Sequence, residues 1–347
     1  MRSRRRFAMT LVGAGAALAV SIGVAFAGAI PGYKGLEGKA ATTFGPVSAK
    51  AGFSGCKIGY QNPLAANESL QVMQKAAIAE AKALKCKLIV LDDALSPDKQ
   101  VSNMQQLLAQ KVNAIVFYPL DPKATTPILA QAKKAGVPVV AIDSNFGNPK
   151  SPVTPGITAQ VWQGRDEMAF LQATALAKVK AGAKVGLIGI GAPVPALKYT
   201  NAREKYYAEK LGLTVVGSED NPTDDVTGGE KAGNALIQRY PDMNAVIAYN
   251  DPSGIGAIVA AKAAGKTLTV IGLNGTSDGI QAVKDGRFAA TVQGDAPGVG
   301  IETVKAAYAL AAKIKLPTKL VILLPHIVTK ATLNSIPSWD AEIKAIK

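Results

Sequence analysis

The sequence predicts an α/β protein built from two doubly wound, parallel-sheet lobes. Its 347 residues, 48% of them hydrophobic, are enough for two cores. Short runs rich in Val and Ile alternate with helical segments, which is typical of parallel strands covered by helices on both faces. The alternation breaks at residues 152–158, which are rich in Pro and Thr, and then begins again. We therefore expect two similar units in succession.

The first 27 residues predict an export signal. Arg2 and Arg4–Arg6 precede an uncharged apolar run that ends in Ala25-Phe26-Ala27, a small-x-small cleavage site. The segment Ser3–Phe7 also resembles a twin-arginine signal. A membrane anchor is the alternative, but the Gly and Ala content makes the run weakly hydrophobic. We expect a cleaved signal and a periplasmic or other extracytoplasmic location in the cell envelope.

Charge and residue counts exclude several classes of function. The chain has 39 Lys+Arg, 25 Asp+Glu and a net charge of +14; cleavage after residue 27 removes four Arg and leaves +10. The lysines are spread over predicted helices without interleaved aromatic residues, so we expect no nucleic-acid partner. One His and two Cys argue against a His-ligated zinc site, a Ser/His/Asp hydrolase and an iron–sulfur protein. We expect neither a metal nor a cofactor.

The elements follow from the spacing of apolar residues. Residues 28–52 show neither helical nor strand periodicity and predict a flexible leader. In the first unit, predicted strands 57–60, 87–91, 114–118 and 138–142 alternate with helices 69–84, 97–110 and 124–135. In the second unit, helices 164–180, 201–210, 228–240 and 254–264 alternate with strands 184–190, 214–217, 245–248 and 269–273. Segments 279–285, 289–293, 298–312 and 320–324 then need places in the two sheets.

Polar residues at the ends of the predicted strands are the first candidates for a binding site. Ligands of parallel α/β sheets bind beyond the carboxyl ends of the strands. The polar side chains at or just after these ends are Asn62, Asn67, Asp143, Asn250, Asn274 and Gln293.

A distinctive order of motifs occupies the second half of the chain. Ala248–Asp251 is followed by a helix, then by Val270–Thr276, Ile280–Gly286 and Ala289–Gln293. With these motifs, the chain from Lys57 to Val328 resembles exported type I solute-binding proteins, the ribose- and galactose-type sugar-binding components of ABC importers. The resemblance implies a type I periplasmic binding protein fold, in which a three-stranded hinge joins two lobes that close over a polyol. LacI-type repressors share this fold, but here an export signal stands where their DNA-binding headpiece would be.

The resemblance also implies a division of the chain. We expect a signal peptide at 1–27, a leader at 28–52, an N-terminal lobe from 53–157 and 295–322, a C-terminal lobe from 158–294 and 323–333, and a tail at 334–347. The implied partners are a sugar or polyol and an ABC permease in the membrane, and we expect a monomer.

Five residues match family positions that bind the ligand. The resemblance assigns a hydroxyl-binding carboxylate to Asp143, amides to Asn67 and Asn250, and a cation at a helix start to Arg203. Asn274 replaces the usual Asp. For Asp143 the alternative is a capping carboxylate, and for Arg203 it is a charge on the helix surface.

Other positions depart from the family pattern. The family's Asn-Pro-Phe-Phe is Asn67-Glu68-Ser69-Leu70 here, and the Arg that follows the Asp is Ser144, so two stacking rings and one cation are lost. We expect Trp162 above all to supply an apolar face, with Tyr60, Phe146 and Tyr249 as alternatives; ordinary packing is the other reading of Trp162. Glu68, Gln160 and Gln293 are expected to reach polar atoms of the ligand.

The two cysteines stand at the starts of consecutive predicted strands. Cys56 lies two residues before Ile58, and Cys86 two before Leu88. If these strands are parallel neighbours, the two Cα atoms come within bridging distance, and export favours oxidation. We predict a Cys56–Cys86 disulfide; two buried free thiols are the alternative.

The expected function is capture of a solute for transport, without catalysis. A sensory binding protein that signals to a membrane receptor remains an alternative, because the sequence does not separate sensing from transport. An exported enzyme acting on a sugar is a further alternative, but it needs a pair of carboxylates, for which only Asp143, Glu68 and Asp295 are available.

Overall fold

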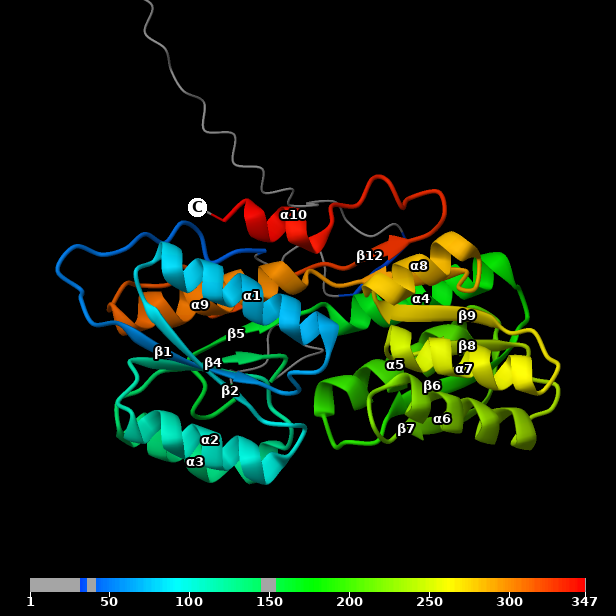
Figure 1. Cartoon of the computed structure of the whole chain (residues 1–347), viewed down its shortest axis with the longest axis horizontal. Coiled ribbons are helices and arrows are strands. Elements are labelled where there is room, and N and C mark those ends of the chain that lie inside the picture. The colour runs from blue at the N-terminus through cyan, green and yellow to red at the C-terminus, as the bar shows by residue number, and fades with distance from the viewer. Residues whose placement is uncertain (1–31, 36–41, 145–153, 347) are drawn as a thin grey trace, which may run out of the picture.

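Two α/β lobes lie side by side along the long axis of the molecule (Figure 1). A computed structural model of the chain describes residues 32–35, 42–144 and 154–346. The predicted signal peptide, residues 1–27, and Phe146 lie outside these residues. Among the described helices, none is both long and apolar enough to cross a bilayer. The predicted fold class is confirmed.

The first lobe is a six-stranded parallel sheet with strand order β11-β5-β4-β3-β1-β2. Its strands are β1 (Lys57–Asn62), β2 (Lys87–Asp92), β3 (Ala114–Phe117), β4 (Val139–Ile142), β5 (Ala159–Trp162) and β11 (Leu320–Ile322). Its helices are α1 (Glu68–Ala83), α2 (Pro97–Ala109), α3 (Pro122–Lys134) and α9 (Ala296–Ala311).

The second lobe repeats this plan with strand order β12-β10-β9-β8-β6-β7. Its strands are β6 (Lys184–Ile190), β7 (Thr214–Asn221), β8 (Ala245–Ala248), β9 (Thr269–Asn274), β10 (Ala290–Gln293) and the antiparallel β12 (His326–Val328). Its helices are α4 (Arg165–Val179), α5 (Pro195–Lys210), α6 (Val226–Arg239), α7 (Asp251–Ala263) and α8 (Ser277–Asp285). A final helix, α10 (Trp339–Lys344), packs against α1 and α9 of the first lobe.

Several central strands are short and are buried along their whole length. Every residue of β3, β4, β8 and β10 is buried, which fits uninterrupted apolar runs between two layers of helices. Helices begin soon after strands end, with polar caps such as Asn67 before α1 and Asn250 before α7. This local order brings polar side chains to the edge of each sheet that faces the other lobe.

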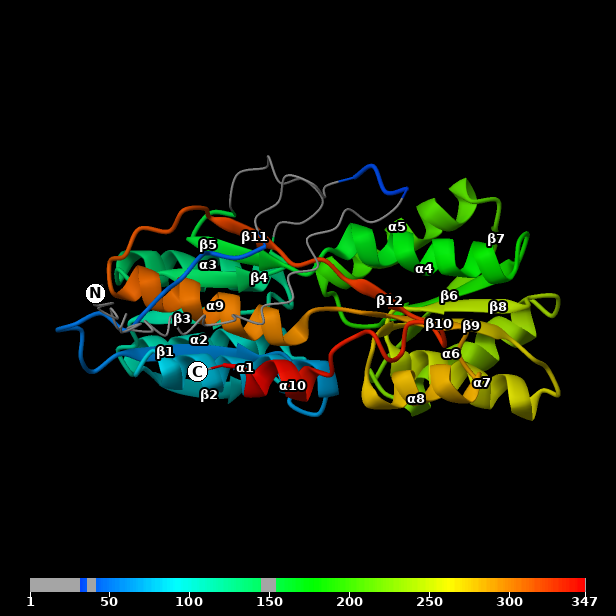
Figure 2. The same ribbon diagram turned by 90° about the horizontal axis from the view of Figure 1, so that it is seen from above.

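Between β5 and β12 the chain crosses between the lobes three times, and after β12 it returns to the first lobe in α10 (Figure 2). The crossings follow β5, β10 and β11. The lobe boundary expected at residues 157/158 is wrong, because β5 pairs with β4 and β11 in the first sheet. Gln160 and Trp162 therefore belong to the first lobe. The sequence did not reveal β5, because the strand has only four residues and follows a Pro-rich segment.

Two elements, α5 and β7, extend well beyond their predicted bounds. Helix α5 begins at Pro195 rather than at residue 201, because a proline at the first helical position is compatible with helix geometry. Strand β7 continues to Asn221 rather than ending at Gly217. Its polar second half, Ser218–Asn221, lacks the apolar pattern that identifies a strand.

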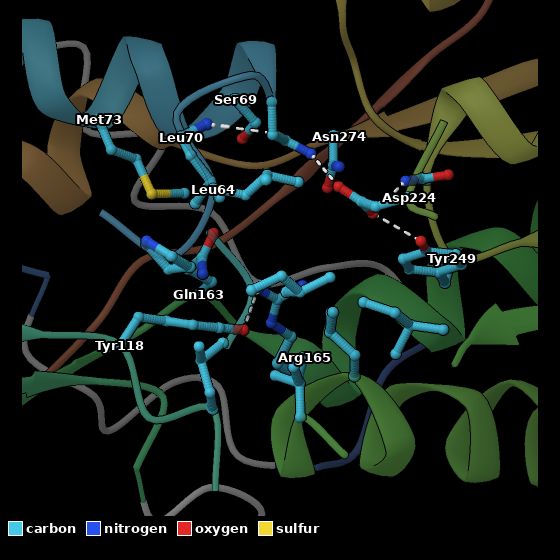
Figure 3. Close-up of a pocket in the computed structure, with 18 residues that line it drawn as sticks. Leu64, Ser69, Leu70, Met73, Tyr118, Gln163, Arg165, Asp224, Tyr249 and Asn274 are labelled. Atoms are coloured by element: carbon cyan, nitrogen blue, oxygen red, sulfur yellow. Dashed lines mark hydrogen bonds between the residues drawn. The ribbon is translucent and has the colours of Figure 1, made fainter. Parts of the chain in front are cut away.

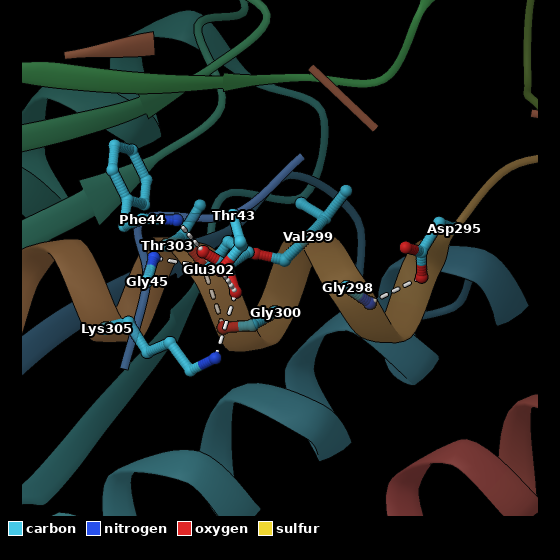
Figure 4. A network of polar contacts seen from close by, with 10 residues as sticks. All are labelled: Thr43, Phe44, Gly45, Asp295, Gly298, Val299, Gly300, Glu302, Thr303 and Lys305. Atoms are coloured by element: carbon cyan, nitrogen blue, oxygen red, sulfur yellow. Dashed lines mark hydrogen bonds and ion pairs between the residues drawn. The ribbon is translucent and has the colours of Figure 1, made fainter. Parts of the chain in front are cut away.

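The expectation that residues 28–52 form a flexible leader is wrong for their described part. Tyr33 is buried against the second lobe, where its hydroxyl donates to Asp166 at 2.6 Å. The backbone N–H of Phe44 donates to Glu302 of α9 at 2.6 Å (Figure 4), and that of Lys50 donates to the hydroxyl of Tyr308 at 2.8 Å. Residues 42–52 therefore pack on the first lobe.

The tail expected at 334–347 also contains a packed element. It includes α10, in which Trp339 is buried and donates from its indole N–H to the carbonyl of Gly294 at 3.3 Å. That carbonyl lies at the second crossing between the lobes.

Cys56 and Cys86 form a disulfide between the starts of β1 and β2. Their Cα atoms are 4.7 Å apart, and the strands pair in parallel from Lys57 and Lys87 onward. The bridge lies at the opposite end of these strands from the second lobe. On the chain-entropy account, closing a loop of this size stabilises the fold by about 3–4 kcal/mol.

Four buried or half-buried carboxyl groups make stability depend on pH. Burial raises the pKa of Asp93 to about 6 and the pKa values of Glu204, Asp251 and Glu342 to about 7. Hydrogen bonds to Asp93, Glu204 and Asp251 offset this only in part. Because the unfolded carboxyls titrate near pH 4, the folded state binds more protons between about pH 4 and about pH 7.

We therefore expect stability to fall as the pH rises through this window. The Tm, followed by scanning fluorimetry at constant ionic strength, should be several degrees lower at about pH 8 than at about pH 5. His326, whose pKa is lowered by burial, acts in the opposite direction but is a single group. Glu342→Gln should lessen the fall. A Tm that is constant or rises with pH would contradict the prediction.

Candidate ligand-binding site

A cavity of about 60 Å³ lies between the two lobes, beyond the carboxyl ends of strands from both sheets (Figure 3). Its apolar walls are aliphatic and come from both lobes. These side chains are Leu64, Leu70, Met73, Leu95 and Leu120 from the first lobe and Ile190, Val194 and Leu197 from the second. Its polar lining is Asn67, Ser69, Tyr118, Gln163, Arg165, Asp224, Tyr249, Asn250 and Asn274.

Three of the predicted binding residues line this cavity. Asn67 and Asn250 cap α1 and α7, accepting from the backbone N–H groups of Leu70 and Ser253 with their side-chain oxygens. The oxygens are used in capping, and the NH2 groups of both amides donate to Asp224 in the cavity wall. Asn274, at the end of β9, lines the wall with a left-handed backbone (φ 101°).

Asp224 is the acceptor that links the two lobes, and sequence reasoning did not select it. Its carboxylate accepts from the Asn67 amide of the first lobe at 2.9 Å. It also accepts from the Asn250 amide at 2.8 Å and from the Tyr249 hydroxyl at 2.6 Å, both in the second lobe. Burial raises the pKa of Asp224, and these donors lower it. Ligands of parallel α/β sheets bind beyond the carboxyl ends of the strands. A prediction that β7 ends at Asn221 would therefore have pointed to Asp224.

Arg165 is the cation of the cavity and was also missed. It stands at the first turn of α4, directly after the first crossing between the lobes. Its Nε donates to Asp143 at 2.8 Å, and its Nη2 donates to the hydroxyl of Tyr118 at 3.1 Å. Burial raises the pKa of that tyrosine beyond its usual range.

Asp143 positions its neighbours and does not line the cavity. Besides Arg165, it accepts from the backbone N–H of Gln163 at 2.8 Å and from the Gln163 side chain at 2.9 Å. The Asp143 side chain is fully buried, and all of these partners are groups of the protein. The expectation that Asp143 accepts bonds from ligand hydroxyls is not met in this arrangement. Arg165 supplies a cation in place of the family's Arg that is lost at Ser144.

Four other predicted residues lie near the cavity without lining it. Glu68 bridges the lobes at the rim, where it accepts from the Ser277 hydroxyl at 2.6 Å. Gln160 accepts from the hydroxyl of Ser144 at 2.7 Å. Trp162 is buried in β5, and Gln293 is buried at the end of β10. Of the aromatic residues considered, Tyr249 lines the cavity.

Arg203 is the predicted residue that the structure places away from the site. It forms an ion pair with Asp166, donates to the hydroxyl of Tyr207 at 3.0 Å and stacks over the ring of Tyr206 at 4.2 Å. Because it faces α4 from the middle of α5, it cannot reach the cavity at the other end of the helix. The alternative of a charge on the helix surface was the better description.

The arrangement suits a small polar molecule that also has C–H surface. Amide, carboxylate and guanidinium groups can satisfy several ligand groups at once, while the aliphatic walls contact carbon. The cavity is smaller than the roughly 150 Å³ that accepts benzene in an engineered protein. A sugar therefore enters only when the lobes part and the Asn67–Asp224 and Glu68–Ser277 contacts open. The described residues contain no group of three or more His, Cys, Asp or Glu side chains placed to hold a metal ion.

Comparison with known proteins adds independent information. Residues 58–315 match the family model described as periplasmic binding protein domain. The ribose import binding protein of Bacillus subtilis is 32% identical over 224 residues, which are 63% of this chain and 70% of that protein. The ribose import binding protein of Salmonella typhimurium is 31% identical over 239 residues, which are 68% of this chain and 78% of that protein.

Solved structures are similar as well. An ABC transporter solute binding protein from Bacillus halodurans C-125, crystallised with bound myo-inositol, superimposes with a TM-score of 0.73. The match covers 84% of this chain and 99% of that chain at 24% identity. At this identity the likeness supports the shared fold.

Proposed function

Because this chain belongs to the periplasmic binding protein domain family, we propose that it captures a sugar or sugar-like polyol between its two lobes and delivers it to an ABC transporter. The family consists of binding proteins, and the relatives include ribose import binding proteins. The ligand would be released unchanged.

The observation that carries the proposal is the shared lining of the interlobe cavity. Asn67 of the first lobe and Asn250 of the second donate to one carboxylate, Asp224. A polyol placed among these groups can exchange hydrogen bonds with both lobes at once. Ligand binding then favours the closed arrangement, because the closed form alone offers both sets of contacts.

Closure produces a conformation that a transporter can recognise. A permease would distinguish the liganded protein by the relative position of the two lobes rather than by the small buried ligand. We propose that the protein acts outside the cytoplasmic membrane as a monomer, with the permease as its membrane partner.

The test is a screen of the purified protein by thermal shift over pentoses, hexoses, cyclitols and sugar acids. A ligand at about one hundred times its Kd should stabilise the protein by about 2.7 kcal/mol, which raises the Tm by several degrees. Mass spectrometry should recover that compound unchanged. Asn274→Ala, which removes a cavity amide without touching a helix cap, should weaken binding.

Asp278→Ala serves as the control, because Asp278 is exposed on α8 and does not line the cavity. It should leave binding unchanged. The proposal fails if no compound of these classes and none of their amino-deoxy derivatives raises the Tm, or if the compound that binds is chemically altered.

A further inference from the structure

We propose that the ligand carries a positively charged amine and that Asp224 binds this amine. The ligand would be an aminated polyol rather than a neutral sugar. This inference rests on the proposed function and narrows the class of solute.

The first argument is the charge balance of the cavity. Arg165 is the only cation that lines it within the described residues, and its guanidinium is already paired with Asp143 at 2.8 Å. Asp224 adds a second carboxylate. The three ionised groups together carry one negative charge. Among the ion pairs of the described residues, none includes Asp224.

The second argument is the nature of the partners of Asp224. All three are neutral donors: the amides of Asn67 and Asn250 and the hydroxyl of Tyr249. Three donors to one carboxyl group favour its ionised form and offset part of the rise in the pKa of Asp224 that burial causes. A carboxylate has about four acceptor positions, so one more donor can be bound. Figure 3 shows the carboxylate at the cavity with the bond to Tyr249 marked.

The third argument is what closure does to this charge. As the lobes close, water leaves the cavity, and a carboxylate without a counter-charge becomes less favourable. A ligand hydroxyl would complete the hydrogen bonding and leave the charge uncompensated. An ammonium group would supply both the donor and the counter-charge, and charge-assisted hydrogen bonds are the stronger ones.

The geometry favours an organic cation over a metal ion. Asn67 and Asn250 direct NH2 groups at Asp224, so their oxygens are not available as ligands there. Calcium requires six to eight oxygen ligands. An amine on a carbon skeleton also suits the aliphatic walls.

Two other groups that line the cavity suit the remaining hydroxyls of the ligand. Arg165 uses Nε and Nη2 within the protein, and the closest partner of its Nη1 is the weakly accepting sulfur of Met168 at 3.8 Å. Nη1 can thus donate to a hydroxyl oxygen. The side chain of Asn274 has no hydrogen-bond partner within the described part of the chain and can both donate and accept.

Calorimetry with matched pairs of compounds tests this inference. Each neutral compound of the screen is paired with its amino-deoxy counterpart, for example D-glucose with D-glucosamine, at neutral pH. We expect the best amine to bind at least tenfold more tightly than its neutral counterpart, which corresponds to about 1.4 kcal/mol. Asp224→Asn should abolish this preference.

Asp225→Asn is the matched control. It removes the same charge from the next residue, which is exposed, and an asparagine can still cap α6. The preference for the amine should persist in this variant. If Asp224→Asn folds poorly, the affinities of the paired compounds for the unchanged protein still show whether the amine is preferred.

The outcomes separate this inference from the proposed function. If neutral compounds bind and their amines bind equally or more weakly, the amine inference is overturned and the proposed function stands. If the preference survives Asp224→Asn, Asp224 is not the group that binds the amine and the inference is wrong. If no compound of either kind binds, both fail.

Discussion

Replacing Arg165 by methionine should lower the free energy of unfolding by about 3–5 kcal/mol. Arg165 and Asp143 are both buried, with 7% and 3% of their surface exposed, and they are paired at 2.8 Å. Methionine fills much of the same volume but leaves the carboxylate of Asp143 without its counter-charge in a buried place. The variant also loses the bond to Tyr118 and the donors that face the cavity, so ligand binding should weaken strongly.

A double-mutant cycle identifies the cause of this loss. The variant Asp143→Asn/Arg165→Met removes both charges, and it should recover a large part of the stability lost in Arg165→Met. Urea unfolding followed by circular dichroism gives the free energies. Arg165→Lys keeps the charge but cannot bond to Asp143 and Tyr118 together, so it should be intermediate. A loss below about 1 kcal/mol in Arg165→Met would contradict the account.

Replacing Asp251 by alanine should lower the free energy of unfolding by about 3–5 kcal/mol as well. Asp251 is fully buried at the start of α7. Its carboxylate accepts from the backbone N–H of Thr276 at 2.7 Å and from the hydroxyls of Thr276 and Thr291 at 3.0 and 2.6 Å. Alanine would leave these donors unpaired in the core, and each such group costs about 1–3 kcal/mol.

The surrounding chain is built around this carboxylate. A Cβ atom at Gly272 would lie 2.1 Å from Oδ1 of Asp251, and one at Gly279 would lie 2.2 Å from its Cγ. Alanine at 251 therefore leaves a hole that neighbouring residues cannot fill with side chains. Urea unfolding measures the loss, with Asp278→Ala as the exposed control, for which we expect a change within about 0.5 kcal/mol. If the two variants lose equal stability, the buried network has no special role.

The sequence allowed the architecture to be predicted because strands and helices differ in local pattern. Buried runs such as Ala245–Ala248 and Val139–Ile142 are apolar throughout, and this is visible without tertiary information. Strand β5 has the same burial but is short and contains Gln160, so local pattern did not reveal it. The packing of Phe44 on α9 depends on contacts more than 250 residues away in sequence, and local pattern contains no trace of it.

The site was predicted in part for a similar reason. Asn67 and Asn250 were identifiable because a cap that follows a buried strand must lie at the ligand-facing edge. The direction in which a side chain points could not be predicted. Asp143 lies at the same edge of the sheet, but its side chain bonds to Gln163 and Arg165. Asp224 was not selected as a ligand-binding residue because it follows the polar half of β7. Asp224 links the two lobes because the Asn67 amide of the first lobe donates to it, and this contact is formed only in the folded protein.

The packing of residues 42–52 has a practical consequence for producing this protein. A recombinant chain begun at Lys57, where the first strand starts, would uncover part of α9. Glu302 would lose the donors that Thr43 and Phe44 supply, and Tyr308 would lose the one from Lys50. Such a shortened version should aggregate more readily, so the N-terminal boundary chosen for expression belongs upstream of Thr43.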